Sequence, residues 1–245
     1  MLEGLRTAAA GMAAQQTKLD AVANDLANAN TTGYKHVRVG FSDLLYEQAG
    51  RPAANGVALG TGARAVQAGR GFEQGALKQT GNPLDVAIRG EGFLKVKLAD
   101  GRQALTRDGE LHVDGNRRLV TSTGAIVQPA ITIPQGVSED RISIAGDGRV
   151  LAAGRQVGRL ELATVRNVQG LESAGENAFV TSAASGNAIA APTATTVAQF
   201  ALEGSNTDMS DAMVDMIDAQ RTYQLTSKAI QTADQMMEIA NGVKR

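Results

Sequence analysis

Two stretches in which an apolar residue recurs at every seventh position, one at each end of the chain, most constrain how this chain can fold. At the N-terminal end the repeat consists of Leu5, Met12, Leu19 and Leu26, with Ala8, Val22 and Ala29 three positions after three of them. At the C-terminal end it consists of Met209, Met216, Tyr223, Ile230 and Met237, each followed three positions later by Ala or Thr. A heptad pattern predicts a helix that packs through one narrow stripe, as in a coiled coil. We therefore expect helices over residues 1–30 and 209–241 that pair as a coiled coil.

The N-terminal helix is expected to end in the segment that leads to Gly33. Thr31 and Thr32 weaken helical continuation, and glycine readily adopts the left-handed backbone conformation that ends many helices. We therefore interpret Gly33 as serving a backbone conformation and not a binding site. At the start of the C-terminal helix, Asp208 or Ser210 is expected to provide the cap.

After the first helix the chain loses any helical period. Val37, Val39 and Phe41 alternate with polar residues or glycine, which predicts a short extended piece. Residues 41–46 form a compact apolar patch that suits one helical turn. Residues 51–71 are rich in Gly, Ala and Pro, which predicts an extended or irregular arm.

Residues 72–204 carry the signals of a β domain. Four Asp-Gly steps, the strongest short-range sign of a hairpin turn, begin at Asp100, Asp108, Asp114 and Asp147. Short strands joined by short turns predict an antiparallel sandwich or an irregular barrel. The expected fold class is α+β, with terminal heptad helices paired as a coiled coil and an inserted, mainly antiparallel all-β domain. The expected segments are a helix in 1–35, an arm in 36–71, the β domain in 72–204 and a helix in 205–245, the first and last forming one discontinuous core.

Composition argues against several classes of function. The 245 residues include 24 basic and 25 acidic ones, so no global field favours nucleic acid or an anionic membrane. Cysteine is absent, which excludes disulfides, thiolate metal sites and cysteine nucleophiles. No apolar run approaches the ~20 residues of a membrane-spanning helix, and the N-terminus lacks the apolar core of a cleavable signal peptide. We expect no membrane insertion.

A search for catalytic or ligand-binding motifs identifies no site. The two histidines, His36 and His112, lie in different segments without an acidic partner at metal-ligand spacing. The glycine doublets at residues 60–62 and 90–92 complete neither a dinucleotide fingerprint nor a phosphate-binding loop. We therefore expect no catalytic residue, no cofactor, no metal and no small-molecule substrate. A secreted β-domain binding protein or enzyme is the weaker alternative.

The terminal heptads allow two interpretations. The helices can form a hairpin within one chain, or their apolar stripes can continue in contacts with helices of other copies. A lone two-helix seam is marginal, because most helix stability in proteins comes from packing an apolar face. We therefore favour self-assembly.

Several motifs, in order along the chain, resemble those of the bacterial flagellar rod and hook proteins. They are Leu26-Ala27-Asn28 followed by Thr32-Gly33-Tyr34-Lys35, then residues 85–93, Thr106-Arg107-Asp108-Gly109, and residues 216–223. Residues 41–46, 60–62, 129–134 and 170–177 resemble the distal rod branch of this family. Asp25 stands where the family usually has a second Asn, and the arm after Tyr46 is shorter than is usual.

This resemblance implies a structural protein that forms a stiff, periplasm-spanning rod in the flagellar basal body. It implies export through the flagellar type III channel, helical self-assembly, and contact with other rod, hook and ring proteins, but with no nucleic acid. The alternative within the family is a proximal rod or hook-type protein. The residues expected at the assembly interface are Leu5, Met12, Leu19, Val22, Leu26, Asn24, Asn28, Asn30, Gly33, Met216, Tyr223, Ile230 and Met237.

Overall fold

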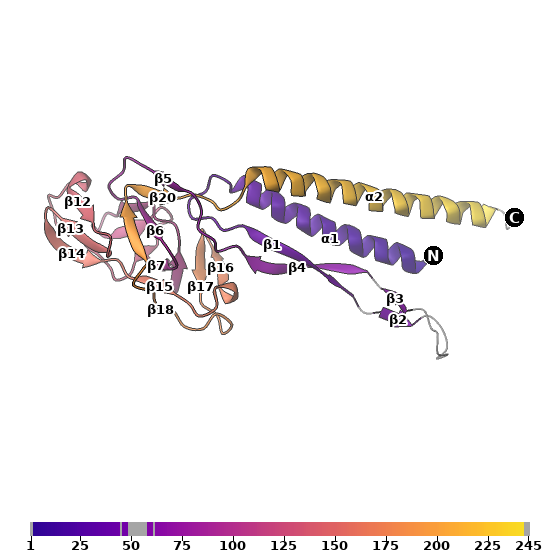
Figure 1. Ribbon diagram of the computed structural model, residues 1–245, viewed down its shortest axis with the longest axis horizontal. Helices are drawn as coiled ribbons and strands as arrows, with labels where there is room; N and C mark the ends of the chain where they lie inside the picture. The colour runs from indigo at the N-terminus through magenta and orange to yellow at the C-terminus, as the bar shows by residue number, and fades with distance from the viewer. Residues whose placement is uncertain (1, 45, 49–57, 61, 243–245) are drawn as a thin grey trace. The chain divides into compact units, whose positions relative to one another are not determined.

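The computed structural model describes residues 2–44, 46–48, 58–60 and 62–242, which form two helices and a mainly antiparallel β region (Figure 1). The chain divides into two compact units. Unit 1 comprises residues 1–27, 37–69 and 208–245, and unit 2 comprises residues 28–36 and 70–207. The α+β class is therefore confirmed. The grouping differs from the predicted segments, because residues 28–36 belong with the β elements and most of the predicted arm belongs with the helices.

Unit 1 is built on the terminal helices α1 (Leu2–Ala27) and α2 (Met209–Gly242), which run antiparallel and side by side (Figure 1). The Nζ atom of Lys18 lies 2.7 Å from the Oδ1 atom of Asp215, and this ion pair joins the two helices. Both predicted helices are confirmed, although α1 ends at Ala27 and not near residue 30. That the helices pack as a coiled coil remains a prediction.

The start of α2 is capped by Asp208. Its Oδ1 atom accepts the backbone N–H groups of Ser210 at 2.7 Å and of Asp211 at 3.3 Å. These are two of the N–H groups that lack a partner within the helix. Of the two predicted capping residues, Asp208 is the one that caps.

Unit 1 also contains short strands. Strand β1 (Val37–Asp43) pairs with β4 (Ala63–Arg70), and β2 (Tyr46–Gln48) pairs antiparallel with β3 (Ala58–Gly60). The extended piece predicted at Val37 to Phe41 is confirmed.

The helical turn predicted over residues 41–46 is wrong. Residues 41–43 belong to β1 and Tyr46 begins β2. Between them the backbone N–H of Leu44 donates to the carbonyl of Gly62 at 2.8 Å, so pairing between chain segments keeps this region extended. Leu45, residues 49–57 and Thr61 of the predicted arm lie outside the described residues.

Unit 2 holds the remaining strands, and each pairing described in it is antiparallel. The largest sheet has nine strands, in the order β16-β17-β8-β7-β11-β10-β9, with β15 also on β7 and β18 on β15. Its strands are β7 (Phe93–Lys97), β8 (Gln103–Thr106), β9 (Leu111–Val113), β10 (Leu119–Thr121), β11 (Ile126–Val127), β15 (Leu162–Thr164), β16 (Glu172–Gly175), β17 (Ala178–Val180) and β18 (Ile189–Ala190). The other strands are β12 (Ile142–Ile144), β13 (Arg149–Ala152) and β14 (Arg155–Arg159) in one sheet, β6 (Val86–Arg89) with β19 (Thr196–Gln199), and β5 (Leu77–Gln79) with β20 (Ala201–Glu203).

The core of unit 2 is mainly aliphatic. Fourteen buried side chains form its largest cluster, among them Leu84, Ile88, Leu111 and Ile133, and all of them are Leu, Val or Ile. A smaller cluster brings together Phe72, Phe93 and Phe179, whose rings meet edge to face at centroid distances of 5.3–6.3 Å. A chain with few aromatic residues thus places three of its five phenylalanines in one cluster.

Three of the four Asp-Gly steps form hairpin turns, as predicted. Asp100 joins β7 to β8, Asp114 joins β9 to β10, and Asp147 joins β12 to β13. The fourth, at Asp108, does not, because β8 and β9 are not neighbours in the sheet.

The carboxylates of the three hairpin turns should make folding sensitive to acid. The pKa of Asp114 is lowered chiefly by a hydrogen bond from the backbone N–H of Arg118, and further by one from the Arg118 side chain. Hydrogen bonds from Arg102 and from Arg149 lower the pKa values of Asp100 and Asp147 in the same way. A pKa that is lower in the folded state gives stability that is present above the unfolded value of about 4 and is lost as pH falls through the folded value.

We therefore expect Asp114→Asn to reduce the dependence of unfolding free energy on pH below about 4, as measured by urea unfolding at several pH values. Asp140→Asn, at an exposed residue of the short helix η1 (Glu139–Arg141), is the matched control. Equal pH slopes for the two variants would contradict the role of the turn carboxylates.

Candidate functional site

The segment after α1, residues 28–36, is bound into unit 2 by its backbone. The N–H of Gly33 donates to the carbonyl of Glu203 at 2.8 Å, and the carbonyl of Thr32 accepts from the side chain of Asn177 at 2.9 Å. The N–H of His36 donates to the side chain of Asn206 at 2.9 Å. A segment next to the N-terminal helix is therefore held by residues far along the chain.

A buried ionic cluster lies at the centre of this anchorage. We call it the Glu203 cluster; it consists of Glu203, Lys35 and Arg107. One carboxylate oxygen of Glu203 lies 2.6 Å from Lys35 Nζ, and the other lies 2.9 Å from Arg107 Nη1. The side chains of Lys35 and Glu203 are fully buried and that of Arg107 is 4% exposed.

Backbone groups complete the cluster. The Lys35 amine also donates to the carbonyl of Glu73 at 2.6 Å, and Arg107 Nη2 donates to the carbonyl of Gly90 at 2.8 Å. The first carboxylate oxygen also accepts the N–H of Gly75 at 3.0 Å. Two cations share one carboxylate, so these carbonyl oxygens help to offset the excess positive charge.

The electrostatics of Lys35 follow from its burial. Loss of solvation lowers the pKa of its amine from the ordinary value, and the hydrogen bond and charge of Glu203 oppose that shift. The guanidinium of Arg107 lies over the ring of Phe93 at 5.3 Å, a cation–π contact, while its Nε atom has no hydrogen-bond partner in the described structure. These side chains bind one another, and their arrangement is that of a structural clamp.

Asp108-Gly109, the Asp-Gly step that forms no hairpin, lies beside this clamp. The Asp108 carboxylate accepts the N–H of Glu110 at 3.1 Å and the hydroxyl of Ser122 at 2.7 Å. A Cβ atom at Gly109 would fall 1.6 Å from the carbonyl oxygen of Val86, so only glycine fits. The absence of a side chain at Gly109 thus lets this turn approach the backbone of Val86 in β6 closely.

The expectation that Gly33 serves a backbone conformation agrees with its φ of +66°, in the left-handed region. The location differs from the prediction, because α1 ends six residues earlier. A Cβ atom at Gly33 would lie 2.6 Å from the backbone N of Asp108 and 2.7 Å from the carbonyl carbon of Arg107. Gly33 therefore ends no helix and instead allows contact with the loop that carries Arg107.

We expect Gly33→Ala to destabilise unit 2 by about 2–4 kcal/mol, because the left-handed conformation costs roughly 1–2 kcal/mol and backbone atoms must also shift. Gly115→Ala is the control, since a Cβ there meets nothing within 4 Å and its φ is not positive. Urea unfolding of both variants provides the measurement. Equal stabilities would contradict the close-approach argument.

The predicted seam residues are on the two helices and differ in burial. Val22 is buried, and Leu5, Met12, Leu19 and Leu26 of α1 are half-buried. In α2, Met216, Ile230 and Met237 are half-buried and Tyr223 is 40% exposed. Their role in contacts between copies stays a prediction.

The three predicted asparagines lie at or after the end of α1. Asn28 is half-buried and its side-chain oxygen accepts the hydroxyl of Thr31 at 3.1 Å, whereas Asn24 and Asn30 are exposed. Asp25, the departure from the family pattern, is buried and accepts the N–H of Val37 at 3.1 Å. An acidic side chain thus bonds the end of the helix to the start of β1. That the asparagines bond to neighbouring copies stays a prediction.

Sequence reasoning missed Glu203. Lys35 and Arg107 appear within the quoted motifs, but no role was assigned to either. The available signal was a single acidic residue directly after the short apolar run Phe200-Ala201-Leu202, which precedes the C-terminal helix. A charge in a buried strand calls for partners of opposite charge.

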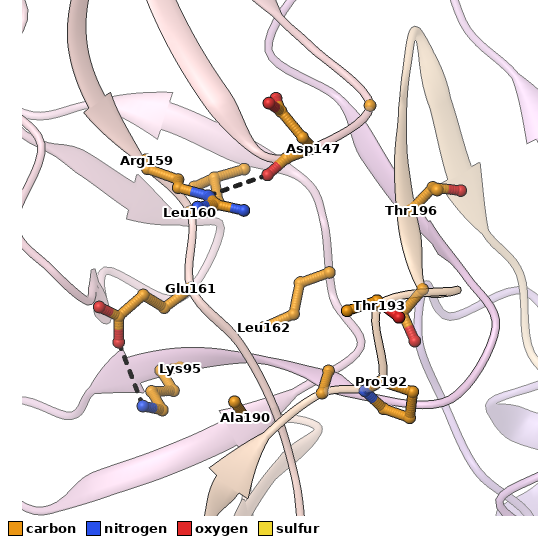
Figure 2. A pocket seen from close by; sticks show the side chains of 13 residues that line it. Lys95, Asp147, Arg159, Leu160, Glu161, Leu162, Ala190, Pro192, Thr193 and Thr196 are labelled. Carbon is orange, nitrogen blue, oxygen red and sulfur yellow. Dashed lines mark hydrogen bonds and ion pairs between the residues drawn. The ribbon is translucent and has the colours of Figure 1, made fainter.

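Unit 2 also contains a cleft of about 570 Å³ (Figure 2). On one side Lys95 Nζ lies 3.1 Å from Glu161 Oε2, and on another Arg159 Nε donates to the backbone carbonyl of Asp147 at 3.1 Å. Pro192, Ala190 and three threonines supply much of the remaining lining. The lining residues contain neither histidine nor serine.

Within the described part of the chain, neither helix combines the length and the apolar character that a membrane crossing requires. A search of the same residues for groups of three or more His, Asp or Glu side chains able to hold a metal ion finds none.

The two terminal helices and the inserted β unit have counterparts in known protein families. Residues 5–35 match the family "Flagella basal body rod protein", residues 87–152 match "Flagellar hook protein FlgE/F/G D1 domain", and residues 198–243 match "Flagellar basal body rod FlgEFG protein C-terminal". Gly33 and Lys35 fall in the first match, Arg107 in the second and Glu203 in the third. The chain therefore belongs to the class of flagellar hook and rod proteins.

Full-length relatives narrow this class. The chain is 41% identical to flagellar basal-body rod protein FlgG of Borreliella burgdorferi, with 100% of both chains covered. It is 39% identical to the protein of that name in Caulobacter vibrioides, over 99% of this chain and 100% of the relative, and 35% identical to that of Bacillus subtilis over 100% of both. The chain belongs to the FlgG family of flagellar basal-body rod proteins.

Proposed function

We propose that this chain is a structural subunit that self-assembles into the distal rod of the flagellar basal body. The full-length similarity to rod proteins named FlgG carries this proposal. The paired terminal helices support it, because they are long elements with exposed apolar side chains that are available for contacts between copies. Such a subunit catalyses no reaction, and its work is mechanical.

The finer features of the proposal concern assembly. The heptad seam of α1 and α2 packs as a coiled coil, and the residues predicted for the interface, from Leu5 to Met237, contribute to contacts in the polymer. Its partners are other copies of itself and other flagellar rod, hook and ring proteins. The chain reaches its periplasm-spanning position by export through the flagellar type III channel, for which a chain without disulfides is suited.

A proximal rod or hook-type role is the second candidate. One family description covers FlgE, FlgF and FlgG together, so the match over residues 87–152 does not separate them. Cryo-electron microscopy of isolated basal bodies, with this chain traced into density, would show whether the chain forms the distal rod, the proximal rod or the hook. Density for this chain in the distal shaft supports the proposal, and density confined to the hook or to the proximal rod contradicts it.

A further inference from the structure

Helix α2 exposes many large apolar side chains. The exposed fractions are 48% for Met213, 59% for Val214, 48% for Ile217, 69% for Leu225, 56% for Met236 and 67% for Ile239. We call these six residues the outer face of α2. In a chain whose core residues are almost completely buried, this helix retains apolar surface that the described part of the chain does not cover.

The outer face lies opposite the side of α2 that packs on α1. The side that packs on α1 is marked by Ala212 and Ala219, which are buried, and by Met216, Ile230 and Ala233, which are half-buried. With about 100° between successive residues, the six outer residues fall on the other side of the helix. Closer packing of α1 against α2 cannot cover them.

Part of α2 also extends past α1. The ion pair between Lys18 and Asp215 sets the antiparallel register, and since both helices rise equally per residue, Leu2 lies level with about residue 231. Met236 and Ile239 follow that point, and Figure 1 shows α2 continuing beyond the start of α1. This last part of the outer face has no α1 segment beside it in the described chain.

The size of the outer face indicates what covers it. A large aliphatic side chain offers on the order of 100 Å² of apolar surface, so six that are half to two-thirds exposed offer roughly 350 Å². A stable one-to-one complex buries about 800 Å² on each partner. The outer face is too small for such a complex and suits a weak contact that is repeated along a polymer of one chain.

The chain itself offers a complementary surface. Ala9, Ala13, Ala23 and Ala27 of α1 are exposed and form two pairs spaced four residues apart, so each pair lies on one face of the helix. Small residues let a second helix approach closely, and bulky side chains fill the space beside them. Two outer faces of α2 set against each other would hold the helix axes farther apart.

We infer that the outer face of α2 is the surface that receives a second copy of this chain, through the exposed alanines of that copy's α1. This inference rests on the proposed function, and it adds to the contacts proposed for the seam residues a contact between copies that is made by residues outside the heptad seam.

Polymer formation by the full-length protein tests the inference. Leu225→Lys and Ile217→Lys place a charge on the outer face, and sedimentation should show that each raises the critical concentration for assembly at least tenfold. Gln220→Lys adds the same charge at an exposed residue that belongs to neither face, and it should change that concentration less than twofold. At a dilution at which none of the proteins assembles, far-ultraviolet circular dichroism of all three variants should match that of the unaltered protein.

Cross-linking tests the assigned partner. The chain has no cysteine, so Leu225→Cys protein mixed with Ala9→Cys, Ala13→Cys, Ala23→Cys or Ala27→Cys protein forms a mixed disulfide only between copies. At least one of the four mixtures should cross-link, and a mixture with Asn116→Cys should not.

The outcomes separate the inference from the proposed function. The inference alone is overturned if Leu225→Lys protein assembles at the same critical concentration as the unaltered protein. It is also overturned if Leu225→Cys protein cross-links only to itself or to none of the four alanine-to-cysteine proteins. If the unaltered chain never polymerises, even when isolated basal bodies are supplied as seeds, the proposed function is overturned and the inference with it.

Discussion

Glu203→Gln is expected to lower the unfolding free energy of unit 2 by about 3–5 kcal/mol, the usual effect of removing one partner from a buried ion pair. Glutamine has nearly the same shape and keeps an oxygen for the N–H of Gly75. It removes the charge that faces both Lys35 and Arg107, so two cations remain buried without a counterion. Urea unfolding of the full-length protein provides the measurement.

The control for this prediction is Glu172→Gln, at an exposed position of β16. Surface changes of this kind usually alter stability by less than about 0.5 kcal/mol. A loss below 1 kcal/mol for Glu203→Gln would show that the clamp contributes little. Lys35→Met in the Glu203→Gln background should recover part of the stability, because it removes one of the two uncompensated charges.

At high dilution, limited proteolysis of the full-length protein is expected to remove most of residues 1–27 and 208–245 and to leave a resistant fragment of about residues 28–207. The buried apolar side chains of the helix pair are small, namely Ala14, Val22, Ala212 and Ala219, while the larger seam residues stay half-exposed. A pair with so little buried surface is marginal alone, so its folding should be coupled to assembly.

The boundaries of the protected fragment differ between the segments predicted from sequence and the hydrogen bonds of the structure. Sequence segmentation places them near residues 35 and 205, whereas the bonds of Gly33 and Lys35 to Glu203 place residues 28–36 within the protected part. Mass spectrometry of the fragment will show which of these boundaries is correct. Helices that resist protease at high dilution would refute the coupling.

A substitution in the seam extends this prediction. Ile230→Lys places an unpaired charge between the helices and should block polymerisation, yet unit 2 should unfold at the same urea concentration as in the unaltered protein. Gln220→Lys is again the control. If unit 2 of the Ile230→Lys protein unfolds much earlier, the helices contribute to its core in the monomer.

Local patterns in the sequence predict much of this fold. The heptads of Leu5 to Leu26 and of Met209 to Met237 predict both helices, and the Asp-Gly steps at Asp100, Asp114 and Asp147 predict three hairpins. Each of these features depends on interactions within a few residues, namely helical periodicity, capping and turn chemistry, which the order of residues specifies directly.

The same local reasoning fails at two places. The apolar patch at residues 41–46 suits a helical turn by composition, but strand pairing makes it extended. The Asp-Gly step at Asp108 has the residues of a hairpin turn, but the strands before and after it, β8 and β9, pair with other strands and not with each other. In both cases contacts with distant chain segments override a local preference.

The sequence by itself therefore determined the terminal helices, the β region between them and, through its motifs, the flagellar family. Only the tertiary structure decided what Gly33, Arg107 and Glu203 do. Lys35 and Glu203 are 168 residues apart in sequence and their side chains are fully buried together. The outer face of α2 likewise became distinct from the seam only once α1 was in place. Both results have one physical reason: a buried ion pair and an uncovered face are properties of packing between remote segments, and no periodicity or turn signal encodes them.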